Sequence, residues 1–580
     1  MNGPAVCAAG LMMNLPFLLP VHRLPIPSFE AEWLAAAFGL LCLLAACVFG
    51  RRLPLAVPAV ALAPLALGAV VAVQAAAGLP AATADAVVVG GYLAFTAALM
   101  TAGHNLARAR GLASLYGALA WALLAGGLAS SLAGFAQYAD LAPLAPALLY
   151  PAEPAAAGIG VYGNVAQQNH FATYTALALA ATLFLFRQGR LPRWPAAGAA
   201  LLLTGALALS GSRSSLLYLG CIGFAWLWTS ADAAAHVHRP PWRRPLAGAT
   251  LLLAAGAALA LLLWFAAQHG LLGPRLARLV AYGEGIGPRT WLWRQAWRII
   301  AAHPWAGVGI DRFAAALVDQ LRPDERLFGV DQYAHNLALQ LLAGCGIAGL
   351  LAVAVPLAAF VRRAARARRG ADAMLAWALL AILFVHSMLE QPLYYTYFLA
   401  IAAFAAGTLD GKAWSAPGHA ARRTAGAAAG AGLLLLAVAG SDYGRLTAEF
   451  YGDQAGDPFD AWHTALLLSL HRDPLFRPLT ELIGPGSFVP ADAPVADRLA
   501  FNTRVLGYAP IAEVVFRQAA LLAEAGQLDA ATRQFRQAAL AYPDDVAAYV
   551  ARIDDLAARD PARFAPLSAS AHALAPRPAP

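Results

Sequence analysis

The chain has 580 residues, of which 60% are hydrophobic and only 12% are charged, and its mean hydropathy is +0.60. Because soluble domains carry about 25% charged residues, this composition excludes an ordinary soluble protein. Continuously apolar runs such as 246–267 lack the period-two alternation of a β-barrel and predict membrane helices instead. The net charge of +8 is almost all arginine placed between apolar runs, so it does not indicate nucleic-acid binding.

The apolar runs predict about thirteen membrane-spanning helices, some shorter than the roughly twenty residues of a simple span. We expect an all-α polytopic membrane protein with spans near residues 5–19, 33–49, 54–73, 85–101, 112–134, 168–186, 196–209, 215–231, 246–267, 337–360, 372–388, 393–408 and 425–440.

The distribution of arginine predicts the orientation of these spans, because short cytoplasmic loops are enriched in basic residues. Loops on one side carry most of the arginines, whereas the short loops on the other side hold only Arg23 and Arg213. The N-terminus is therefore expected in the cytoplasm. The loops expected on the outer, periplasmic face are 20–32, 135–167, 210–214, 268–336 and 389–392.

The tail after Gly440 is richer in acidic residues and is expected on the same outer side. Within it, Leu521–Pro543 resembles one tetratricopeptide (TPR) unit, with two short helices, a glycine turn and a proline stop. An ordinary helical hairpin is the alternative. We therefore predict a transmembrane domain over residues 1–440, with a catalytic loop near 268–336, and a periplasmic helical, TPR-like domain over residues 441–580.

Two outward-facing polar segments precede apolar runs. The segment Gly163–Tyr174 contains Gln167, Asn169 and His170, and although Asn169 can cap the following helix, capping does not explain the whole cluster. The segment Ser210–Ser215 holds Arg213 at a Ser/Gly turn. An arginine there can snorkel to lipid headgroups or bind an anion together with turn N–H groups.

The other two outward segments flank the second half of the membrane region. In the long loop, Arg289–Ile300 reads as an amphipathic, Trp-rich helix, followed by His303–Ile310 and then by Asp331–Leu337, where His335 and Asn336 precede an apolar run. The last segment, His386–Tyr397, holds Glu390, Tyr394 and Tyr395. Its tyrosines can form an interfacial belt, but a carboxylate at membrane depth is costly and indicates function.

Together these segments resemble the O-antigen ligase/polymerase superfamily, whose members move glycans from a polyprenyl-pyrophosphate carrier. Ser210–Leu217, Arg289–Phe313 and Tyr333–Leu350 carry the resemblance to the superfamily. Gly163–Tyr174 and His386–Phe398 are similar to its protein O-oligosaccharyltransferases, the pilin-glycosylating PglL type. One departure is Gln168, where the family pattern leads us to expect proline.

The resemblance implies a GT-C-like helical fold in the inner membrane with a periplasmic active site. It implies transfer of a preassembled oligosaccharide from undecaprenyl pyrophosphate to Ser or Thr hydroxyls of exported, pilin-like proteins. His335 is implied as the essential histidine and Arg213 and Arg289 as ligands of the pyrophosphate. The substrate-binding set implied or suggested around them is Gln167, Asn169, His170, Asn336, Glu390, Tyr394 and Tyr395. No cofactor and no metal are expected, since the loop carboxylates include no close Asp-x-Asp pair.

This chemistry suits the residue types. Guanidinium groups neutralise a departing pyrophosphate, and an imidazole with a pKa near ~6.5 can accept the proton of a hydroxyl or act as a further cation. The sequence leaves both roles of His335 open. It also leaves open an O-antigen ligase acting on lipid A-core or an O-antigen polymerase, which use the same donor. A transporter of lipid-linked glycans is a third alternative, but it would place polar residues at the bilayer midplane.

Overall fold

The computed structural model describes residues 2–50, 53–79, 83–151, 160–230, 287–323, 329–368, 370–415, 419–451 and 461–574. These residues form two compact units. The first comprises Met1–Leu65, Tyr92–Glu284 and Val353–Phe450, and the second comprises Ala66–Gly91, Gly285–Ala352 and Tyr451–Pro580. Each unit is described by itself below.

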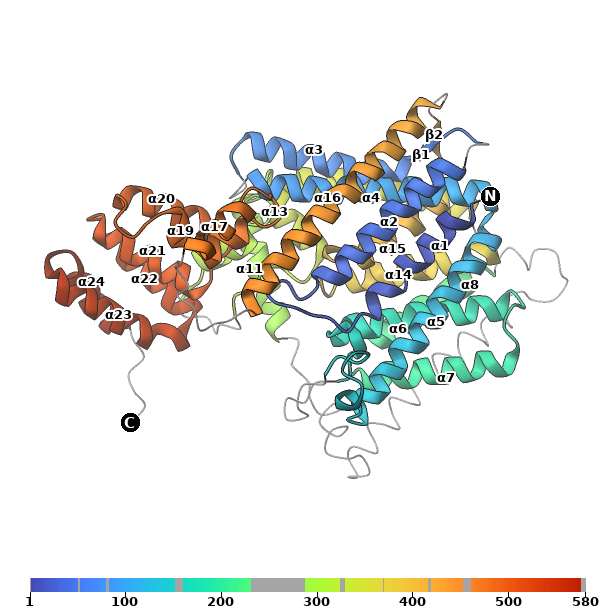
Figure 1. Ribbon diagram of the computed structural model, residues 1–580, viewed down its shortest axis with the longest axis horizontal. Coiled ribbons are helices and arrows are strands. Elements are labelled where there is room, and N and C mark those ends of the chain that lie inside the picture. Colours follow the sequence, from blue (N-terminus) through green and yellow to red (C-terminus); the bar gives the residue numbers. More distant parts are fainter. Residues whose placement is uncertain are drawn as a thin grey trace. The chain divides into compact units, whose positions relative to one another are not determined.

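The fold is almost entirely helical, and Figure 1 labels its elements. The helices up to residue 451 are α1 (Gly3–Met12), α2 (Phe29–Phe49), α3 (Leu62–Ala76), α4 (Thr83–Arg110), α5 (Leu112–Tyr138), α6 (Gln168–Arg187), α7 (Arg193–Leu209), α8 (Ser214–Trp228), α11 (Gly287–Ala302), α12 (Phe313–Asp319), α13 (Leu337–Ala367), α14 (Met374–Ser387), α15 (Thr396–Leu409) and α16 (Ala420–Tyr451). The later helices are α17 (Ala461–Leu470), α18 (Arg477–Ile483), α19 (Pro485–Phe488), α20 (Val495–Tyr508), α21 (Ala512–Glu524), α22 (Leu528–Ala541), α23 (Val546–Arg559) and α24 (Pro561–Leu574).

Helices α1 to α8 and α13 to α16 fall on predicted spans, with ends that differ by several residues. Seven of them are long and apolar enough to cross a membrane, and five shorter apolar helices accompany these in the described part of the chain. The prediction of an all-α, multi-pass membrane protein is therefore confirmed. The predicted span 246–267 lies outside the described residues, so the total of about thirteen, the GT-C-like arrangement and the orientation stay predictions.

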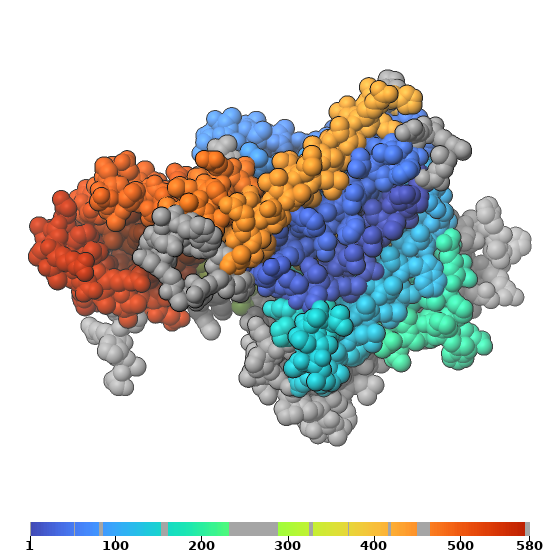
Figure 2. All heavy atoms as spheres, viewed as in Figure 1, coloured from blue at the N-terminus to red at the C-terminus, as the bar shows by residue number. Residues whose placement is uncertain are grey.

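The first unit is built by close packing of helices rich in alanine and glycine. Helix α6 packs between α5 and α7, and most of its residues are buried (Figure 1). Helix α16 runs along α2, and Figure 2 shows it as a ridge over that helix. Gly432 and Gly440 of α16 permit this approach, because a Cβ at either position would lie 2.9 Å from Leu40 or from Trp33.

A buried carboxylate joins several elements of this unit. Asp410 is fully buried and accepts hydrogen bonds from the backbone N–H groups of Val60 (2.7 Å) and Lys412 (3.1 Å) and from the Arg363 guanidinium (3.0 Å). Beside it, strand β1 (Ala56–Pro58) pairs antiparallel with β2 (Ala413–Ser415). Because a buried charge is costly unless it is paired, Asp410 fixes the end of α15 against these strands and α13.

In the second unit the loop after α11 docks on a break in α13. The N–H groups of Val308 and Gly309 donate to the carbonyls of Ala343 (2.9 Å) and Gly344 (3.0 Å). Gly346 has φ 64° and ψ −166°, and a Cβ there would lie 2.2 Å from the Trp305 carbonyl oxygen. This glycine therefore permits both the kink and the backbone contact.

The tail helices of the second unit share one hydrophobic core with the loop helices. Phe516 of α21 and Phe535 of α22 belong to the same buried cluster as Trp291 of α11 and Leu317 of α12. Gln537 also donates to the Asp319 carbonyl at 3.2 Å. A single helical hairpin cannot bury its own apolar face, and here the loop helices and α23 and α24 cover that face.

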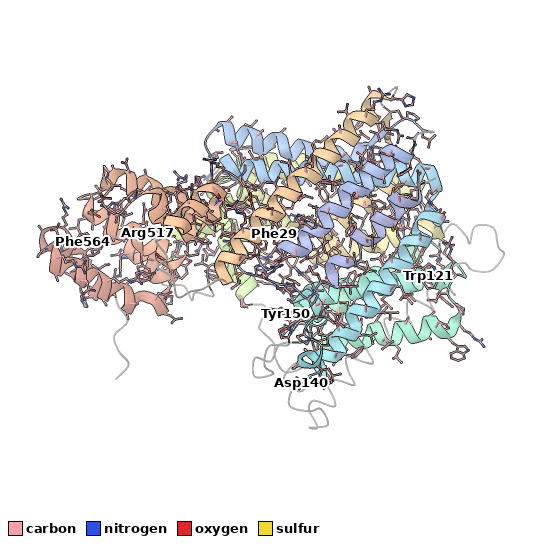
Figure 3. The ribbon with its side chains drawn as sticks, in the orientation of Figure 1. Phe29, Trp121, Asp140, Tyr150, Arg517 and Phe564 are labelled. Atoms are coloured by element: carbon pink, nitrogen blue, oxygen red, sulfur yellow. The ribbon has the colours of Figure 1, made fainter. Side chains whose placement is uncertain are left out.

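The predicted pair of helices around the glycine turn is confirmed as α21 and α22. Gly526 has φ 75° between them, and Pro543 follows α22. Figure 3 labels Arg517 of α21 and Phe564 of α24, and the Phe564 side chain is buried in the same core. The TPR-like assignment and the domain boundary at residue 440 stay predictions.

We expect Gly346→Ala to destabilise the second unit by at least about 3 kcal/mol. Its backbone angles lie in a region that only glycine adopts readily, and the added methyl group would collide with the Trp305 carbonyl. Thermal unfolding of the purified protein in detergent measures the loss. Gly220→Ala in α8 is the control, because a Cβ there meets nothing within 4 Å, and an equal loss in both variants would contradict the role given to Gly346.

Candidate functional site

The predicted site residues fall into both units. Gln167, Asn169, His170, Arg213, Glu390, Tyr394 and Tyr395 belong to the first unit, whereas Arg289, His335 and Asn336 belong to the second. The geometry within each unit is described in turn.

The start of α6 is capped by Gln167, and the alternative that Asn169 caps it is wrong. The Gln167 Oε1 atom accepts a hydrogen bond from the His170 N–H at 2.5 Å. Gln168 occupies the first helical position, where proline is favoured because no N–H is needed there, so the glutamine is compatible with the same turn. Its Oε1 accepts from the Gly160 N–H at 3.3 Å. The side chain of Asn169 is thus available for other contacts.

Asn169 links three of the polar segments found in the sequence. Its Nδ2 donates to Glu390 Oε1 at 3.1 Å, and its Oδ1 accepts from Ser212 Oγ at 2.8 Å. Glu390 is only 8% exposed, so its charge is held among protein groups instead of bulk water. One amide side chain therefore joins the start of α6, the Ser/Gly turn before α8 and the loop after α14.

His170 lies fully inside this region. Its Nδ1 is 3.1 Å from the Tyr397 hydroxyl, and its ring meets the Tyr395 ring edge-on at a centroid distance of 4.5 Å. One turn further along α6, the Thr173 hydroxyl lies 2.8 Å from His386 Nδ1. Such a buried, hydrogen-bonded and ring-packed histidine orients its neighbours, and Tyr395 is the predicted site residue that it contacts most directly.

Glu32 was missed by the sequence analysis. It lies in the first turn of α2, where its carboxylate accepts from Ser28 Oγ (2.6 Å), Thr396 Oγ1 (3.0 Å) and the Tyr92 hydroxyl (3.1 Å). Thr396 follows Tyr395 directly, so Glu32 anchors the segment that carries the predicted tyrosines. The rule that singled out Glu390, an acidic residue at the end of an apolar helix, would also have found Glu32.

Two further polar residues hold together loops of the first unit that we predict on the outer side. Asn164 donates to the carbonyls of Leu18 and Leu148, both at 2.8 Å, and its carbonyl oxygen lies 2.7 Å from His22 Nε2. Figure 3 labels Tyr150 in the same region, and its ring meets the His22 ring edge-on. These contacts bring the N-terminal segment to the loop that precedes Gln167.

Arg213 lies at the N-cap position of α8 and is exposed. The preceding Ser212 is buried and bonded to Asn169. The turn is thereby fixed, and it places the arginine at the start of a helix whose first N–H groups favour an anion. This arrangement suits a phosphate ligand.

In the second unit, the backbone on both sides of His335 is held in place. The Ala334 N–H donates to Gln340 Oε1 at 2.8 Å, and the Ala334 carbonyl accepts from Trp293 Nε1 at 3.1 Å. Asn336 caps α13 by accepting from the Leu339 N–H at 3.1 Å. The position of His335 is therefore set by α11 and by the start of α13.

His335 itself adopts φ 48°, a left-handed conformation that non-glycine residues seldom take and that is enriched at functional sites. Its side chain is 23% exposed, and Nε2 lies 3.8 Å from Asp331 Oδ1. The imidazole is thus partly accessible and lies near a carboxylate.

Arg289 lies in the first turn of α11 and is half-buried. The predicted amphipathic helix is confirmed, since Trp291 is buried in the core whereas Trp297 is 56% exposed. Among the described residues no group of three or more His, Cys, Asp and Glu side chains could hold a metal ion. The expectation of a reaction without metal stays a prediction.

Comparisons with known proteins cover the four polar segments found in the sequence. The sequence model of the O-antigen ligase family matches residues 198–354, which include Arg213, Arg289 and His335. The protein glycosylation ligase model matches residues 161–186, which include Gln167, Asn169 and His170. The model of the C-terminal region of the virulence factor membrane-bound polymerase matches residues 374–554.

A curated relative is similar over most of its length. The general O-oligosaccharyltransferase of Acinetobacter baylyi is 26% identical over 425 residues, which cover 69% of this chain and 69% of the relative. These matches confirm the resemblance to the PglL-type O-oligosaccharyltransferases and O-antigen ligases that the motifs indicated. The role of each individual site residue stays a prediction.

We expect Asn169→Leu to destabilise the first unit by about 1–3 kcal/mol, because it removes the amide that bonds both Glu390 and Ser212. Thermal unfolding in detergent measures the change. Gln188→Leu at the other end of α6 is the control, since the Gln188 side chain makes no hydrogen bond with a described residue. A shift no larger than that of the control would remove Asn169 from its linking role.

Asp311 makes the stability of the second unit depend on pH. Burial raises the pKa of Asp311 to about 6, and the nearby charge of Asp85 adds to the rise. A carboxyl group whose pKa is higher in the folded than in the unfolded state binds more protons when folded, so it lowers the stability in full above about pH 6, and this loss shrinks as the pH falls from 6 and vanishes only below the ordinary pKa of 3.8.

We therefore expect Asp311→Asn to stabilise the folded state at pH 8 by roughly 1–2 kcal/mol, and to stabilise it by clearly less near pH 4.5. Asparagine tolerates the left-handed backbone of this position, where φ is 62°. Melting curves of both proteins between pH 4.5 and 8 measure the difference, and a gain that is independent of pH would contradict the assignment.

Proposed function

We propose that this chain is a protein O-oligosaccharyltransferase. It transfers a preassembled oligosaccharide from undecaprenyl pyrophosphate to Ser or Thr hydroxyls of exported, pilin-like proteins at the periplasmic face of the inner membrane. The match of residues 161–186 to the protein glycosylation ligases carries this proposal. That segment holds Gln167, Asn169 and His170, and its likeness to protein glycosylation ligases supports a protein acceptor over the glycolipid acceptor of an O-antigen ligase. The curated relative, named for general O-oligosaccharyl transfer, supports the same class.

The reaction breaks one bond at the anomeric carbon of the glycan and forms another. The hydroxyl oxygen of the acceptor attacks the anomeric carbon of the glycan, the bond from that carbon to the pyrophosphate oxygen breaks, and undecaprenyl pyrophosphate leaves with the bonding electrons. The hydroxyl proton passes to a base. The chief demands on the protein are thus to stabilise a leaving anion and to take up a proton.

We propose that arginine side chains bind the pyrophosphate anion and that a histidine accepts the proton. Arg213, exposed at the start of α8, and Arg289, in the first turn of α11, supply guanidinium groups of the type that binds phosphate oxygens in pairs. His335 takes the acceptor proton, and Asp331 Oδ1, 3.8 Å from Nε2, stabilises the imidazolium that results. In the alternative, His335 is already protonated and acts as a third cation on the pyrophosphate.

The polar network of the first unit is assigned to substrate orientation. Glu390 and Asn169 supply a carboxylate and an amide, the groups that sugar hydroxyls and peptide N–H groups recognise. Tyr394 and Tyr395 add aromatic surface beside them. Gln167 and Asn336 act through the backbone as helix caps, so we regard both as positioning residues.

An O-antigen ligase or polymerase is the second candidate, because the matches at residues 198–354 and 374–554 carry those names. The donor chemistry of these enzymes is the same. The acceptor therefore decides between the candidates.

The test gives purified protein a glycan linked to undecaprenyl pyrophosphate together with a pilin-like protein or with lipid A-core. We expect glycan on the protein. His335→Ala is expected to lower the rate by about 10²–10⁴-fold and Arg213→Ala or Arg289→Ala by about 10²–10³-fold.

Matched controls come from the same loop. His303→Ala and Arg294→Ala remove exposed side chains of the same types and are expected to keep nearly full activity. Glycan found only on lipid A-core would overturn the choice of acceptor. Full activity of His335→Ala would remove that residue from the reaction, whichever acceptor is used.

A further inference from the structure

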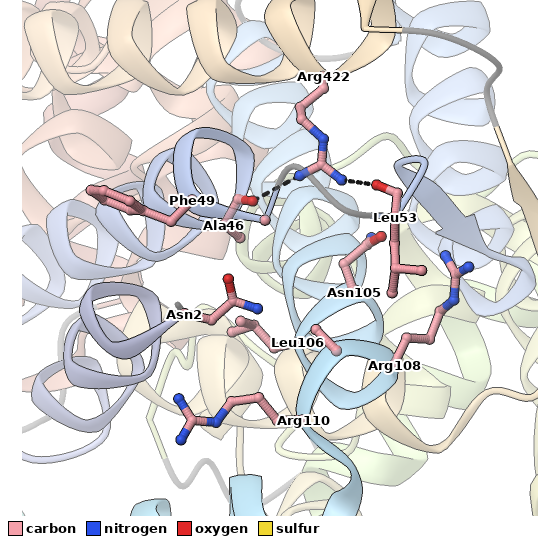
Figure 4. A pocket seen from close by; sticks show the side chains of 11 residues that line it. Asn2, Ala46, Phe49, Leu53, Asn105, Leu106, Arg108, Arg110 and Arg422 are labelled. Carbon is pink, nitrogen blue, oxygen red and sulfur yellow. Dashed lines mark hydrogen bonds between the residues drawn. The ribbon is translucent and has the colours of Figure 1, made fainter.

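The first unit contains a cavity that is lined by none of the residues assigned above. It has a volume of about 400 Å³ and is lined from the start of α1, the ends of α2 and α4, and the start of α16. These are the helix ends that carry arginines, on the side that the arginine distribution predicts to be cytoplasmic. Figure 4 shows the polar lining residues Asn2, Asn105, Arg108, Arg110 and Arg422.

The cavity lining carries positive charge, and no acidic residue among the described lining residues balances it. Three of the described lining residues are arginines and none is acidic. Arg422 is only 8% exposed, and its guanidinium donates to the carbonyls of Ala46 (2.8 Å) and Leu53, not to a carboxylate. A buried guanidinium satisfied by neutral carbonyls alone retains its full charge, so an anion in the cavity would be strongly favoured.

Other side chains that line the cavity can donate hydrogen bonds to a ligand. Asn2 is only 9% exposed, and its side chain has no hydrogen-bond partner in the described part of the chain, although it points into the cavity (Figure 4). Arg110 makes no hydrogen bond or ion pair with described residues, and Arg108 donates only one bond, to the Pro54 carbonyl at 3.3 Å. The first turn of α1 adds backbone N–H groups and the positive end of its dipole.

The remaining lining is apolar and continues to the surface. Phe49 and Leu53 line the cavity and are 44% and 38% exposed. Leu106 forms part of the inner wall and is buried. A free phosphate ion needs no such surface, whereas a phospholipid brings a phosphate together with acyl chains that cover exposed aromatic and aliphatic side chains.

We propose that this cavity binds the phosphate of an anionic phospholipid, with its acyl chains against Phe49 and Leu53. Arg108 and Arg110 reach the phosphate oxygens, Asn2 donates its amide N–H, and Arg422 supplies charge while it holds the chain between α2 and β1. The site is separate from the proposed glycan transfer and requires none of its residues. Its ligand resembles the lipids that basic clusters at the ends of membrane helices attract.

The test measures lipid binding to the whole protein, purified in uncharged detergent and stripped of lipid. Native mass spectrometry and thermal unfolding are carried out with phosphatidylglycerol, with phosphatidylcholine and with inorganic phosphate at matched ionic strength. The variants are Arg108→Gln/Arg110→Gln, which removes two exposed guanidiniums, and Asn2→Ala. Arg193→Gln is the control, since Arg193 is an exposed arginine from the same predicted side that does not line the cavity.

We expect the native chain and Arg193→Gln to prefer phosphatidylglycerol over phosphatidylcholine, and the double variant to bind phosphatidylglycerol about ten- to a hundredfold more weakly, as the loss of charge-assisted hydrogen bonds implies. Asn2→Ala should show a smaller loss. Lipid-free melting temperatures equal to that of the native chain exclude misfolding.

Three results would overturn the proposal. The first is an unchanged preference for phosphatidylglycerol in the double variant, and the second is an equal loss in Arg193→Gln. The third is stabilisation by inorganic phosphate as strong as that by phosphatidylglycerol, which would assign the cavity to a free anion instead of a lipid.

Discussion

A charge removed from water must find partners, and the described part of the first unit depends on how three carboxylates meet this constraint. Asp410 is held by Arg363 and by backbone N–H groups, Glu390 by Asn169, and Glu32 by three hydroxyl groups. Asp410 closes the end of α15 that the arginine distribution predicts to be cytoplasmic, whereas Glu390 and Glu32 lie at the opposite helix ends. The two faces are thus fixed by the same physical means. The polar side chains around Glu390 and Asn169 are the ones that we assign to glycan transfer.

In the second unit, backbone contacts hold the segments around His335 in place. The turn after α11 donates hydrogen bonds to carbonyls at the break in α13. Glycines allow these two segments of the chain to come into contact. Both segments lead to His335, because α11 bonds Ala334 through Trp293 and α13 begins at the Asn336 cap. A catalytic group needs a fixed position more than a strong contact of its own. The strained backbone of His335 is consistent with a position imposed by its surroundings.

The sequence predicted the elements better than the partners of individual side chains. Apolar runs and an amphipathic pattern suffice to find the helices, because burial in lipid or in a core acts on whole stretches. They do not reveal that Gln167 caps α6 while Asn169 bonds to Glu390, a residue more than two hundred positions away. Either amide could have made either bond. The local signal at Glu32, a carboxylate at the end of an apolar helix, was overlooked, and its contact with Thr396 cannot be seen in the sequence.

The shared core of the second unit also changes how the tail must be interpreted. Phe516 and Phe535 pack in the cluster that contains Trp291, and α11, which carries Trp291, also holds the backbone next to His335 through Trp293. Removal of the tail would expose this cluster and loosen α11, so a loss of activity would follow even if the tail never touched an acceptor. A role in acceptor recognition can be separated from this structural role only through exposed tail residues, such as Arg533 or Arg536, whose replacement leaves the core intact. The tail is therefore, first of all, part of what positions the histidine.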